Sequence, residues 1–327
     1  MSGSPNLPTQ WLLDSPEPWT RYRTLVDLLG CPESSTEVLA ARAAMLDHPR
    51  VQSLVAGLDG WPEGPIKRHN DASHAIHKLA VLADFGFRAG DPGIDTVTGA
   101  ILGRQSPEGA FQSLLNIAQA FGGSGEDQWI WILCDAPVLL YALLSMGFGG
   151  EPRVQRAVEH LVGLVEQNGW RCRGAPEIGK FHGPGRRSDP CPIANLLALK
   201  AISQVESLLD SPAAHLGAEM ILGHWQNQGE RKFYMFGIGT DFRKLKYPFI
   251  WYDILHVVAV LSRFPWLKTD PRLLEMTAMI ADKAGEQGLF TPESVYKAWC
   301  DWDFGQKRTP SSWITFLAHH TLILSRS

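Results

Sequence analysis

The sequence has few cysteines, few charges and no long apolar run. Its five cysteines are dispersed over 327 residues: Cys31, Cys134, Cys172, Cys191 and Cys300. An odd, scattered set predicts free thiols in a reducing compartment rather than a disulfide framework. Charged residues make up 20% of the chain and the net charge is −4, which disfavours nucleic acid and anionic membranes as partners.

Two kinds of targeting segment are also missing from the sequence. No stretch approaches the roughly 18 apolar residues that a membrane-spanning helix needs. The start, MSGSPNLPTQ, is polar and lacks the basic region that opens a signal peptide. We therefore expect a cytoplasmic protein without a transmembrane segment.

What the sequence does contain is a ladder of prolines at steps of 60, 60, 60 and 59 residues. The five are Pro32, Pro92, Pro152, Pro212 and Pro271. Four of them follow a residue that can cap a helix, namely Asp91, Glu151, Ser211 and Asp270. A cap followed by proline marks a helix start, because the first helical position needs no backbone N–H donor. The spacing therefore predicts an array of similar helical units.

Each unit has the same pattern: an apolar helix, a short turn to the proline, then an amphipathic helix that ends near glycine and an aromatic residue. We expect buried helices at 20–30, 74–87, 134–148, 191–202, 252–264 and 312–324. We expect outer helices such as 33–57 and 152–167. The pattern predicts an all-α chain, a single α/α toroid of about six helix pairs that spans residues 1–327. An open helical solenoid is the alternative.

The links between helices are unequal in length. Those from outer to buried helix, at 111–132, 170–190, 227–250 and 290–311, are long, and long links in a compact domain are usually functional. The ends of buried helices that they lead into carry Cys134, Cys191 and His256. A ring of polar groups on apolar walls is what a ligand pocket needs. We therefore expect the functional site at this end of the repeat.

The repeats resemble those of the terpenoid cyclase and protein prenyltransferase toroid superfamily. The strings ILGRQSPEGAF (101–111) and LVGLVEQNGW (161–170) are similar to its squalene-cyclase repeat, in which glutamine, glycine and an aromatic follow an outer helix. The resemblance implies an enzyme that acts on an apolar, isoprenoid-like substrate by transfer, cyclisation or elimination.

Cyclases of this superfamily protonate an alkene with an Asp-x-Asp-Asp motif. The most similar string here is Asp301-Trp302-Asp303-Phe304, which lacks the last aspartate. By resemblance, Asp303 is a candidate catalytic acid.

Prenyltransferase β subunits instead hold a catalytic zinc with Asp-x-Cys and a distant histidine, and they pair with a separate α subunit. By resemblance, Asp189, Cys191 and His256 would bind Zn²⁺, a partner subunit is possible, and Arg186, beside Arg187, would bind an anionic head group. Carboxylate, thiolate and imidazole with an open fourth position suit a catalytic zinc.

Further candidates come from position and composition. Asp135 and Asp253 occupy equivalent places in two repeats and are candidate acids or bases, with His256 as a further catalytic candidate. The least repeat-like segment, 236–256, carries Arg243 and Lys244, which could bind an anionic head or form a solvated face. Indole faces can stabilise a cation. The candidate aromatic substrate contacts are Trp131, Tyr252, Trp299 and Trp302.

Three functions are consistent with these observations. The first is the prenyltransferase- or cyclase-like enzyme. The second is a carbohydrate-active (α/α)₆-barrel enzyme, which needs a tryptophan-lined cleft and two opposed carboxylates. The third is a non-catalytic scaffold that binds a peptide or a partner subunit through an exposed apolar patch.

Overall fold

The protein is described by a computed structural model that covers residues 6–178, 186, 188–229 and 236–326. The prediction of an all-α chain is confirmed, because the regular structure of these residues is helical except for one antiparallel pair of short strands. No helix in this part of the chain is long and apolar enough to cross a bilayer. The chain divides into two compact units, one formed by residues 1–54 and 239–327 and the other by residues 55–238. That it forms a single domain stays a prediction.

The first unit joins the two ends of the sequence. Its helices are α1 (Thr9–Leu13), α2 (Pro18–Arg23), α3 (Thr36–Leu46), α11 (Ile254–Leu261), α12 (Pro271–Ala281) and α13 (Ser312–Leu324), and α4 (Pro49–Ala56) crosses its boundary. Helix α13 packs against α2, α11 and α12. Its residues are buried almost all round, whereas α12 buries one face, which is the predicted pairing of an inner with an outer helix.

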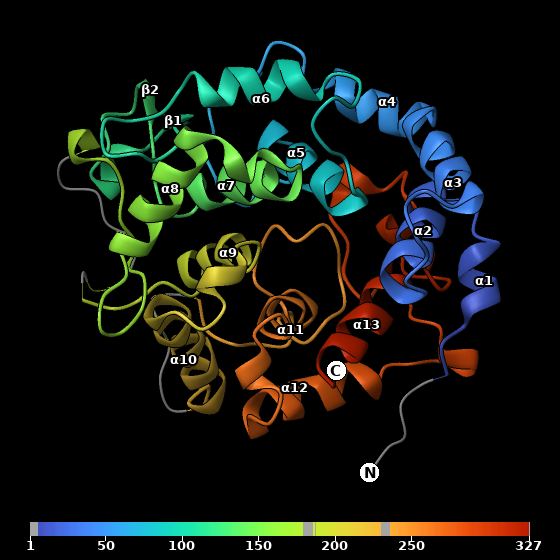
Figure 1. The fold of residues 1–327 in the computed structure, drawn as a ribbon. Helices are drawn as coiled ribbons and strands as arrows, with labels where there is room; N and C mark the ends of the chain where they lie inside the picture. The colour runs from blue at the N-terminus through green and yellow to red at the C-terminus, as the bar shows by residue number, and fades with distance from the viewer. Residues whose placement is uncertain (1–5, 179–185, 187, 230–235, 327) are drawn as a thin grey trace. The chain divides into compact units, whose positions relative to one another are not determined.

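The second unit repeats the inner and outer arrangement. Its elements are α5 (Ala75–Phe85), α6 (Ile94–Leu102), β1 (Ser113–Asn116), β2 (Asp127–Ile130), α7 (Ala136–Ser145), α8 (Pro152–Gly163), α9 (Pro192–Ile202) and α10 (Pro212–Gln226). The buried helix α7 packs against α5 and α9 (Figure 1), while α8 and α10 cover α7 and α9. The five buried helices α5, α7, α9, α11 and α13 begin and end within three residues of the predicted bounds.

The proline ladder marks helix starts at three of its five positions. Pro152, Pro212 and Pro271 are the first residues of α8, α10 and α12. Two predicted caps are confirmed: the Ser211 side chain accepts a hydrogen bond from Ala214 N, and Asp270 accepts one from Arg272 N. Glu151 precedes α8 without a side-chain cap, because its carboxylate binds Arg153 instead.

The first two prolines of the ladder do not begin helices. Helix α6 starts after Pro92, with Gly93 in the left-handed region at φ 78°. Helix α3 starts four residues after Pro32, with Ser35 as its cap. The predicted outer helix 33–57 is two helices, because Pro49 interrupts the hydrogen-bond ladder. The predicted buried helix 20–30 is α2 continued by a π-helical turn, Thr24–Leu28.

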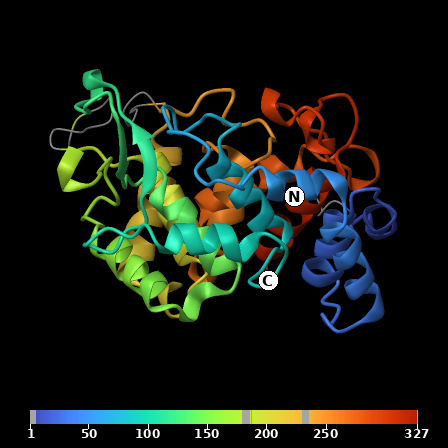
Figure 2. The same ribbon diagram turned by 90° about the horizontal axis from the view of Figure 1, so that it is seen from above.

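The long links contain their own structure. The link 111–132 forms an antiparallel hairpin in which Ser113 pairs with Ile130 and Asn116 with Asp127 (Figure 2). Its strand β1 also meets the link before α5, where Ile66 and Leu115 form a parallel bridge. Backbone hydrogen bonds also hold the residues at the starts of α9, α11 and α13, where Cys191 N donates to Trp170 O, Ile254 N to Phe242 O and Ser311 N to Phe290 O.

Candidate functional site

The first unit contains a buried carboxyl group at the start of α13, that of Asp303. Its Oδ2 atom accepts hydrogen bonds from Ser311 Oγ at 2.7 Å, Ser312 Oγ at 3.1 Å and the backbone N–H of Trp313 at 3.1 Å. Its Oδ1 atom is buried and has no hydrogen-bond partner among the described residues. Burial raises the pKa of Asp303 above its ordinary value, although the three donors oppose that shift. The carboxyl group thus combines a raised pKa with three donors that stabilise its charged form.

Glu17 is a second carboxyl group coupled to the first, and no pattern in the sequence marks it as a site residue. It precedes Pro18, the first residue of α2, and its side chain is buried. Burial and the negative charge of Asp303 raise the pKa of Glu17 to about 7, against the opposing charge of Arg50, whose guanidinium lies 3.7 Å away. Two carboxyl groups that interact in this way titrate as a pair, so the pair retains a proton near neutral pH.

Hydroxyl groups connect the segments that carry the two acids. Ser15 Oγ donates to Ser312 Oγ at 2.8 Å, and the Glu17 backbone N–H donates to Ser15 Oγ at 3.1 Å. Ser312 in turn donates to Asp303 Oδ2. The network fixes the loop before α2 against the start of α13, and it explains why residues almost 300 positions apart share one site.

Aromatic rings cluster around Trp302, the residue directly before Asp303. The Trp302 ring stacks on Phe304 with centroids 5.6 Å apart, and it lies 5.0 Å from Trp19 and 5.7 Å from Trp299. Trp299 and Trp302 are buried at 3% and 8% exposure. Both predicted aromatic candidates of this link therefore lie next to the predicted acid, and Trp19 joins them from the start of the chain.

A second polar group in the same unit surrounds Asp253, the residue before α11. Its Oδ1 atom accepts a hydrogen bond from His256 N at 3.0 Å, which makes it the cap of the helix. Its Oδ2 atom is buried without a partner among the described residues. Burial raises the pKa of Asp253 to about 7, although the nearby charge of Lys246 lowers it. Burial and the charge of Asp253 in turn raise the pKa of the Tyr296 phenol.

The other candidates of this unit have structural contacts. The His256 ring stacks on Phe249 at 4.6 Å, with its Nδ1 atom 3.2 Å from the Trp251 carbonyl oxygen. Tyr252 is buried against Phe242, with ring centroids 5.6 Å apart. These contacts fix His256 and Tyr252 in place around the start of α11.

The basic cluster of the segment 236–256 is partly neutralised by Asp241. Lys246 binds Asp241 Oδ2 at 2.9 Å, and Lys244 lies 3.4 Å from Oδ1. These lysines lower the pKa of Asp241, Lys246 through its hydrogen bond most of all. The Arg243 guanidinium donates to the Gly239 carbonyl oxygen at 3.3 Å.

The second unit holds Asp135 at the start of α7, paired with a histidine. The Asp135 Oδ1 atom lies 3.2 Å from His69 Nδ1, and the carboxylate is 2% exposed. Burial alone would lower the pKa of His69, but the Asp135 carboxylate and Cys191 raise it above its ordinary value. The ring of His77 reaches the His69 carbonyl oxygen at 2.8 Å. The Asp135 side chain thus binds the His69 ring and does not cap the helix.

Three of the five cysteines meet beside this pair. Hydrogen bonding to Cys172 and to Cys191, together with burial, raises the pKa of the Cys134 thiol. Cys191 is the residue before α9 and is 1% exposed. All five cysteines are free thiols, as the sequence predicts.

The remaining candidates of the second unit lie in the loops around α7 and α9. Trp131 is buried, with its ring 4.8 Å from that of His160, beside a cavity of about 10 Å³. Asp189 N donates to the Arg186 carbonyl oxygen at 3.0 Å, and the Arg186 side chain is exposed. Arg187 lies outside the described residues.

The zinc hypothesis is not tested by these positions. Asp189 and Cys191 belong to the second unit and His256 to the first. Within each unit, no three histidine, cysteine, aspartate or glutamate side chains of the described residues are grouped closely enough to hold a metal ion. Zinc therefore stays a prediction.

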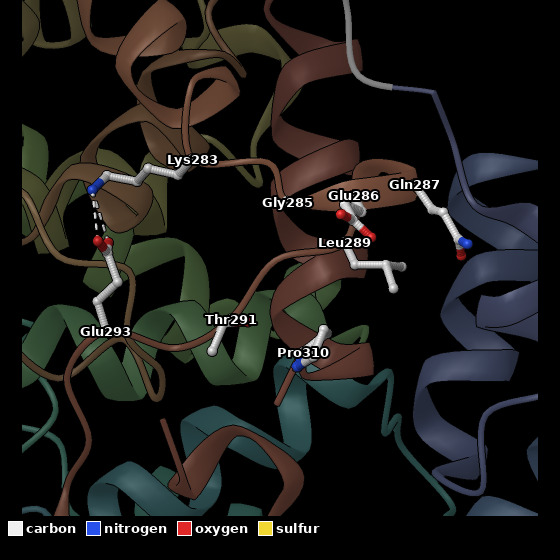
Figure 3. Close-up of a pocket in the computed structure, with 8 residues that line it drawn as sticks. All are labelled: Lys283, Gly285, Glu286, Gln287, Leu289, Thr291, Glu293 and Pro310. Atoms are coloured by element: carbon white, nitrogen blue, oxygen red, sulfur yellow. Dashed lines mark hydrogen bonds and ion pairs between the residues drawn. The ribbon is translucent and has the colours of Figure 1, made fainter. Parts of the chain in front are cut away.

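An open pocket of about 500 Å³ lies in the first unit, away from all predicted residues. Figure 3 shows Lys283 pointing toward Glu293, and their charged groups are 2.8 Å apart. Glu286, Gln287 and Leu289 line the pocket from the turn after α12, and Pro310 lines it from the segment before α13. Since Glu293 Oε2 also accepts the Leu245 N–H at 2.8 Å, this ion pair anchors the segment 241–250.

Comparisons with known proteins give a likeness in structure only. No family model matches the sequence, and no curated protein matches it. The type II terpene cyclase MstE from Scytonema, solved in its apo form, is similar over 94% of this chain and 87% of its own, with 13% identity and a TM-score of 0.43. A protein from Actinoplanes is similar over 84% of this chain and 98% of its own, with 12% identity and a TM-score of 0.30. At such identities and TM-scores, function must be argued from the chain's own residues.

Sequence reasoning missed two members of these sites, Glu17 and His69. Glu17 stands between prolines in SPEPW, where it reads as an ordinary residue before a helix. His69 lies in a link that carries no repeat signal. A buried partner far along the chain gives each residue its chemistry, and such a partner leaves no local pattern.

Proposed function

We propose that the protein is an enzyme that protonates a carbon–carbon double bond of an apolar, isoprenoid-like substrate, with Asp303 as the general acid. The observation that supports this most is the Asp303 carboxyl group itself, with one oxygen bound by three donors and the other buried without a partner among the described residues. Protonating an alkene needs an acid that keeps its proton in an apolar site and then releases it.

The hydrogen bonds assign the proton to one atom. Because Oδ2 accepts three hydrogen bonds, the proton of the neutral acid sits on Oδ1. In the proposed step, the alkene π electrons bond to this proton and the O–H electron pair stays on the carboxyl group. The Ser311, Ser312 and Trp313 donors then stabilise the carboxylate, and they lie at the N-terminus of α13, where the helix dipole favours a negative charge.

The aromatic rings suit the other product of the step. Proton transfer leaves a carbocation on the substrate, and indole and phenyl faces attract a cation. Trp302 and its stacked neighbour Phe304 are closest in sequence to the acid, with Trp19 and Trp299 against Trp302. The cation then rearranges or closes a ring and loses a proton, and the acid regains one, so the overall reaction is an isomerisation without net consumption of acid.

Glu17 contributes by holding the shared proton in the pair. Its pKa of about 7 means that about half of the Glu17 side chains keep their proton at pH 7. Roles for Asp135, Asp253 and His256 in catalysis, for Arg186, Arg243 and Lys244 in binding an anionic head, and for Trp131 and Tyr252 in substrate contact stay predictions, as does the zinc set.

The test measures deuterium uptake by isoprenoid chains in deuterium oxide, with linear C10 to C30 polyprenes, their alcohols and their diphosphates as probes. The full chain should place one deuterium on a terminal alkene carbon of its substrate. Asp303→Asn, which keeps the shape but holds no acid proton, should lower the rate by about 10²- to 10⁴-fold.

Asp301→Asn is the matched control, because Asp301 lies two residues away and is exposed. It should retain activity within about twofold, as surface substitutions away from a site usually change little. Full activity in Asp303→Asn, or a loss confined to Asp301→Asn, would overturn the proposal.

A further inference from the structure

Three segments of the second unit run side by side and each carries one cysteine. The Leu133 N–H donates to the Arg173 carbonyl oxygen at 2.9 Å, and the Ala175 N–H donates to the Trp131 carbonyl oxygen at 2.8 Å. Ile132 is therefore opposite Gly174 in antiparallel register. Cys134 follows Leu133 at the turn into α7, and Cys172 precedes Arg173, so the hydrogen bond between Leu133 and Arg173 brings the two cysteines onto adjoining stretches of backbone.

The third cysteine approaches from the other side of the same segment. The Cys191 N–H donates to the Trp170 carbonyl oxygen at 2.9 Å, and Arg171 is opposite Pro190 in antiparallel register. The segment 170–175 thus lies between the other two. The packing of α7 against α9, whose first turns follow Cys134 and Cys191, holds the outer segments in place.

The three thiols differ in their access to solvent. Cys172 is half-buried, whereas Cys134 is 8% exposed and Cys191 1%. A small oxidant in solution therefore reaches Cys172 first. The Cys134 thiol lies on the segment that hydrogen-bonds to the one carrying Cys172 and is coupled to its thiol, so it is placed to react with an oxidised Cys172.

We propose that Cys172 and Cys134 form an oxidation-sensitive thiol pair that closes a disulfide bond on exposure to hydrogen peroxide or an alkyl hydroperoxide. A disulfide needs Cα atoms roughly 4.4–6.8 Å apart. The backbone hydrogen bond between their neighbours Leu133 and Arg173, at 2.9 Å, holds Cys134 and Cys172 on adjoining segments, where this bond can form.

The chemistry takes two steps and balances. The Cys172 sulfur attacks one peroxide oxygen, the O–O bond breaks, and a sulfenic acid forms while water, or an alcohol from an alkyl hydroperoxide, leaves. The Cys134 sulfur then attacks the Cys172 sulfur, the S–O bond breaks, and water leaves with the thiol proton. Two thiols are oxidised and one peroxide is reduced. The new bond would tie the segment 170–175 to the turn directly before Asp135, which positions His69.

The experiment uses the full chain with Cys31→Ser and Cys300→Ser, because exposed Cys300 and half-buried Cys31 would otherwise react with peroxide or link molecules. The protein is treated with hydrogen peroxide, alkylated, digested and mapped by mass spectrometry. We expect a peptide pair linked through Cys134 and Cys172 that a dithiol reductant separates, with Cys191 alkylated.

Two variants show the order of events. Cys134→Ser should leave Cys172 as a sulfenic acid that dimedone traps. Cys172→Ser should slow thiol loss from the cluster by about tenfold or more, because reactivity follows exposure. Two results in the chain that keeps all three thiols would overturn the proposal: a main product linked through Cys191, or a sulfinic acid at Cys172 while Cys134 stays a free thiol. Neither result requires a variant of Cys134, Cys172 or Cys191 to fold.

Discussion

The stability of the protein should fall as Glu17 loses its proton, and Glu17→Gln should abolish that loss. In the folded chain burial and Asp303 raise the pKa of Glu17 from its ordinary value of 4.5 to about 7. The folded state therefore holds this proton more tightly than the unfolded state. The stability that this proton contributes is fully present below pH 4.5 and is lost as the pH rises to about 7.

The magnitude follows from the size of the shift. Each pKa unit corresponds to ~1.36 kcal/mol, so a rise from 4.5 to about 7 corresponds to about 3 kcal/mol at most. Solvent screening near Arg50 reduces this value, and we expect about 1–2 kcal/mol. Gln has the shape of protonated Glu but no charge to lose. Glu17→Gln should therefore match the native chain at pH 4.5 and exceed it by about 1–2 kcal/mol at pH 8.

The assay is urea unfolding of both proteins at pH 4.5, 6 and 8, followed by tryptophan fluorescence. Comparing the two chains at each pH cancels the titration of Asp253 and of other groups that both share. Glu126→Gln is the matched control, since Glu126 is exposed in the loop before β2, and it should show the same difference from the native chain at every pH. A difference for Glu17→Gln that does not change with pH, or a variant less stable than the native chain at pH 8, would refute the reasoning.

Three further predictions concern Asn195, the pair of Asp135 and His69, and the candidate zinc ligands. Asn195→Ala should lower the free energy of unfolding by about 2–4 kcal/mol in urea titrations. The fully buried amide makes three hydrogen bonds, to Trp170 N, Trp170 O and Cys191 O, and the substitution leaves these buried backbone groups without their partner. A loss under about 1 kcal/mol would contradict this. Asp135→Asn should lower the pKa of His69, measured by NMR titration of its ring protons, because the carboxylate opposes the effect of burial, and an unchanged pKa would show that the pair is not electrostatically coupled. If Asp189, Cys191 and His256 hold zinc, elemental analysis should find about one zinc ion per purified chain, and Cys191→Ser should lose that zinc. A folded, active chain that contains no metal would contradict the zinc hypothesis.

Much of the helical framework could be predicted because it depends on local signals. Apolar periodicity located the five buried helices, and Pro152, Pro212 and Pro271 fixed the starts of three outer ones. The prediction was wrong where a second local signal competed, as at Pro49, which divides the outer helix 33–57, and at Gly93, which delays α6 past Pro92. The hairpin within 111–132 was missed because its two four-residue strands are too short to show a period.

The candidate sites were predictable only in part. Asp303, Trp299 and Trp302 were identified from a short motif and an unusual link, and the structure places them together. The partners that set their chemistry, Glu17 and Trp19, lie about 285 residues earlier in the chain. The basic cluster of 236–256 was recognised, but its neutralisation by Asp241 depends on how the segment turns back on itself.

The sequence by itself determined which segments are helical and which helices are buried, because helix starts, periodicity and apolarity act over a few neighbouring residues. Only the tertiary structure decided which polar groups lose water and which meet one another. The tertiary contacts raise the pKa values of Asp303 and Glu17, pair Asp135 with His69, and bring Cys134 beside Cys172. The physical reason is that desolvation and charge coupling depend on distance in space and not on distance along the chain.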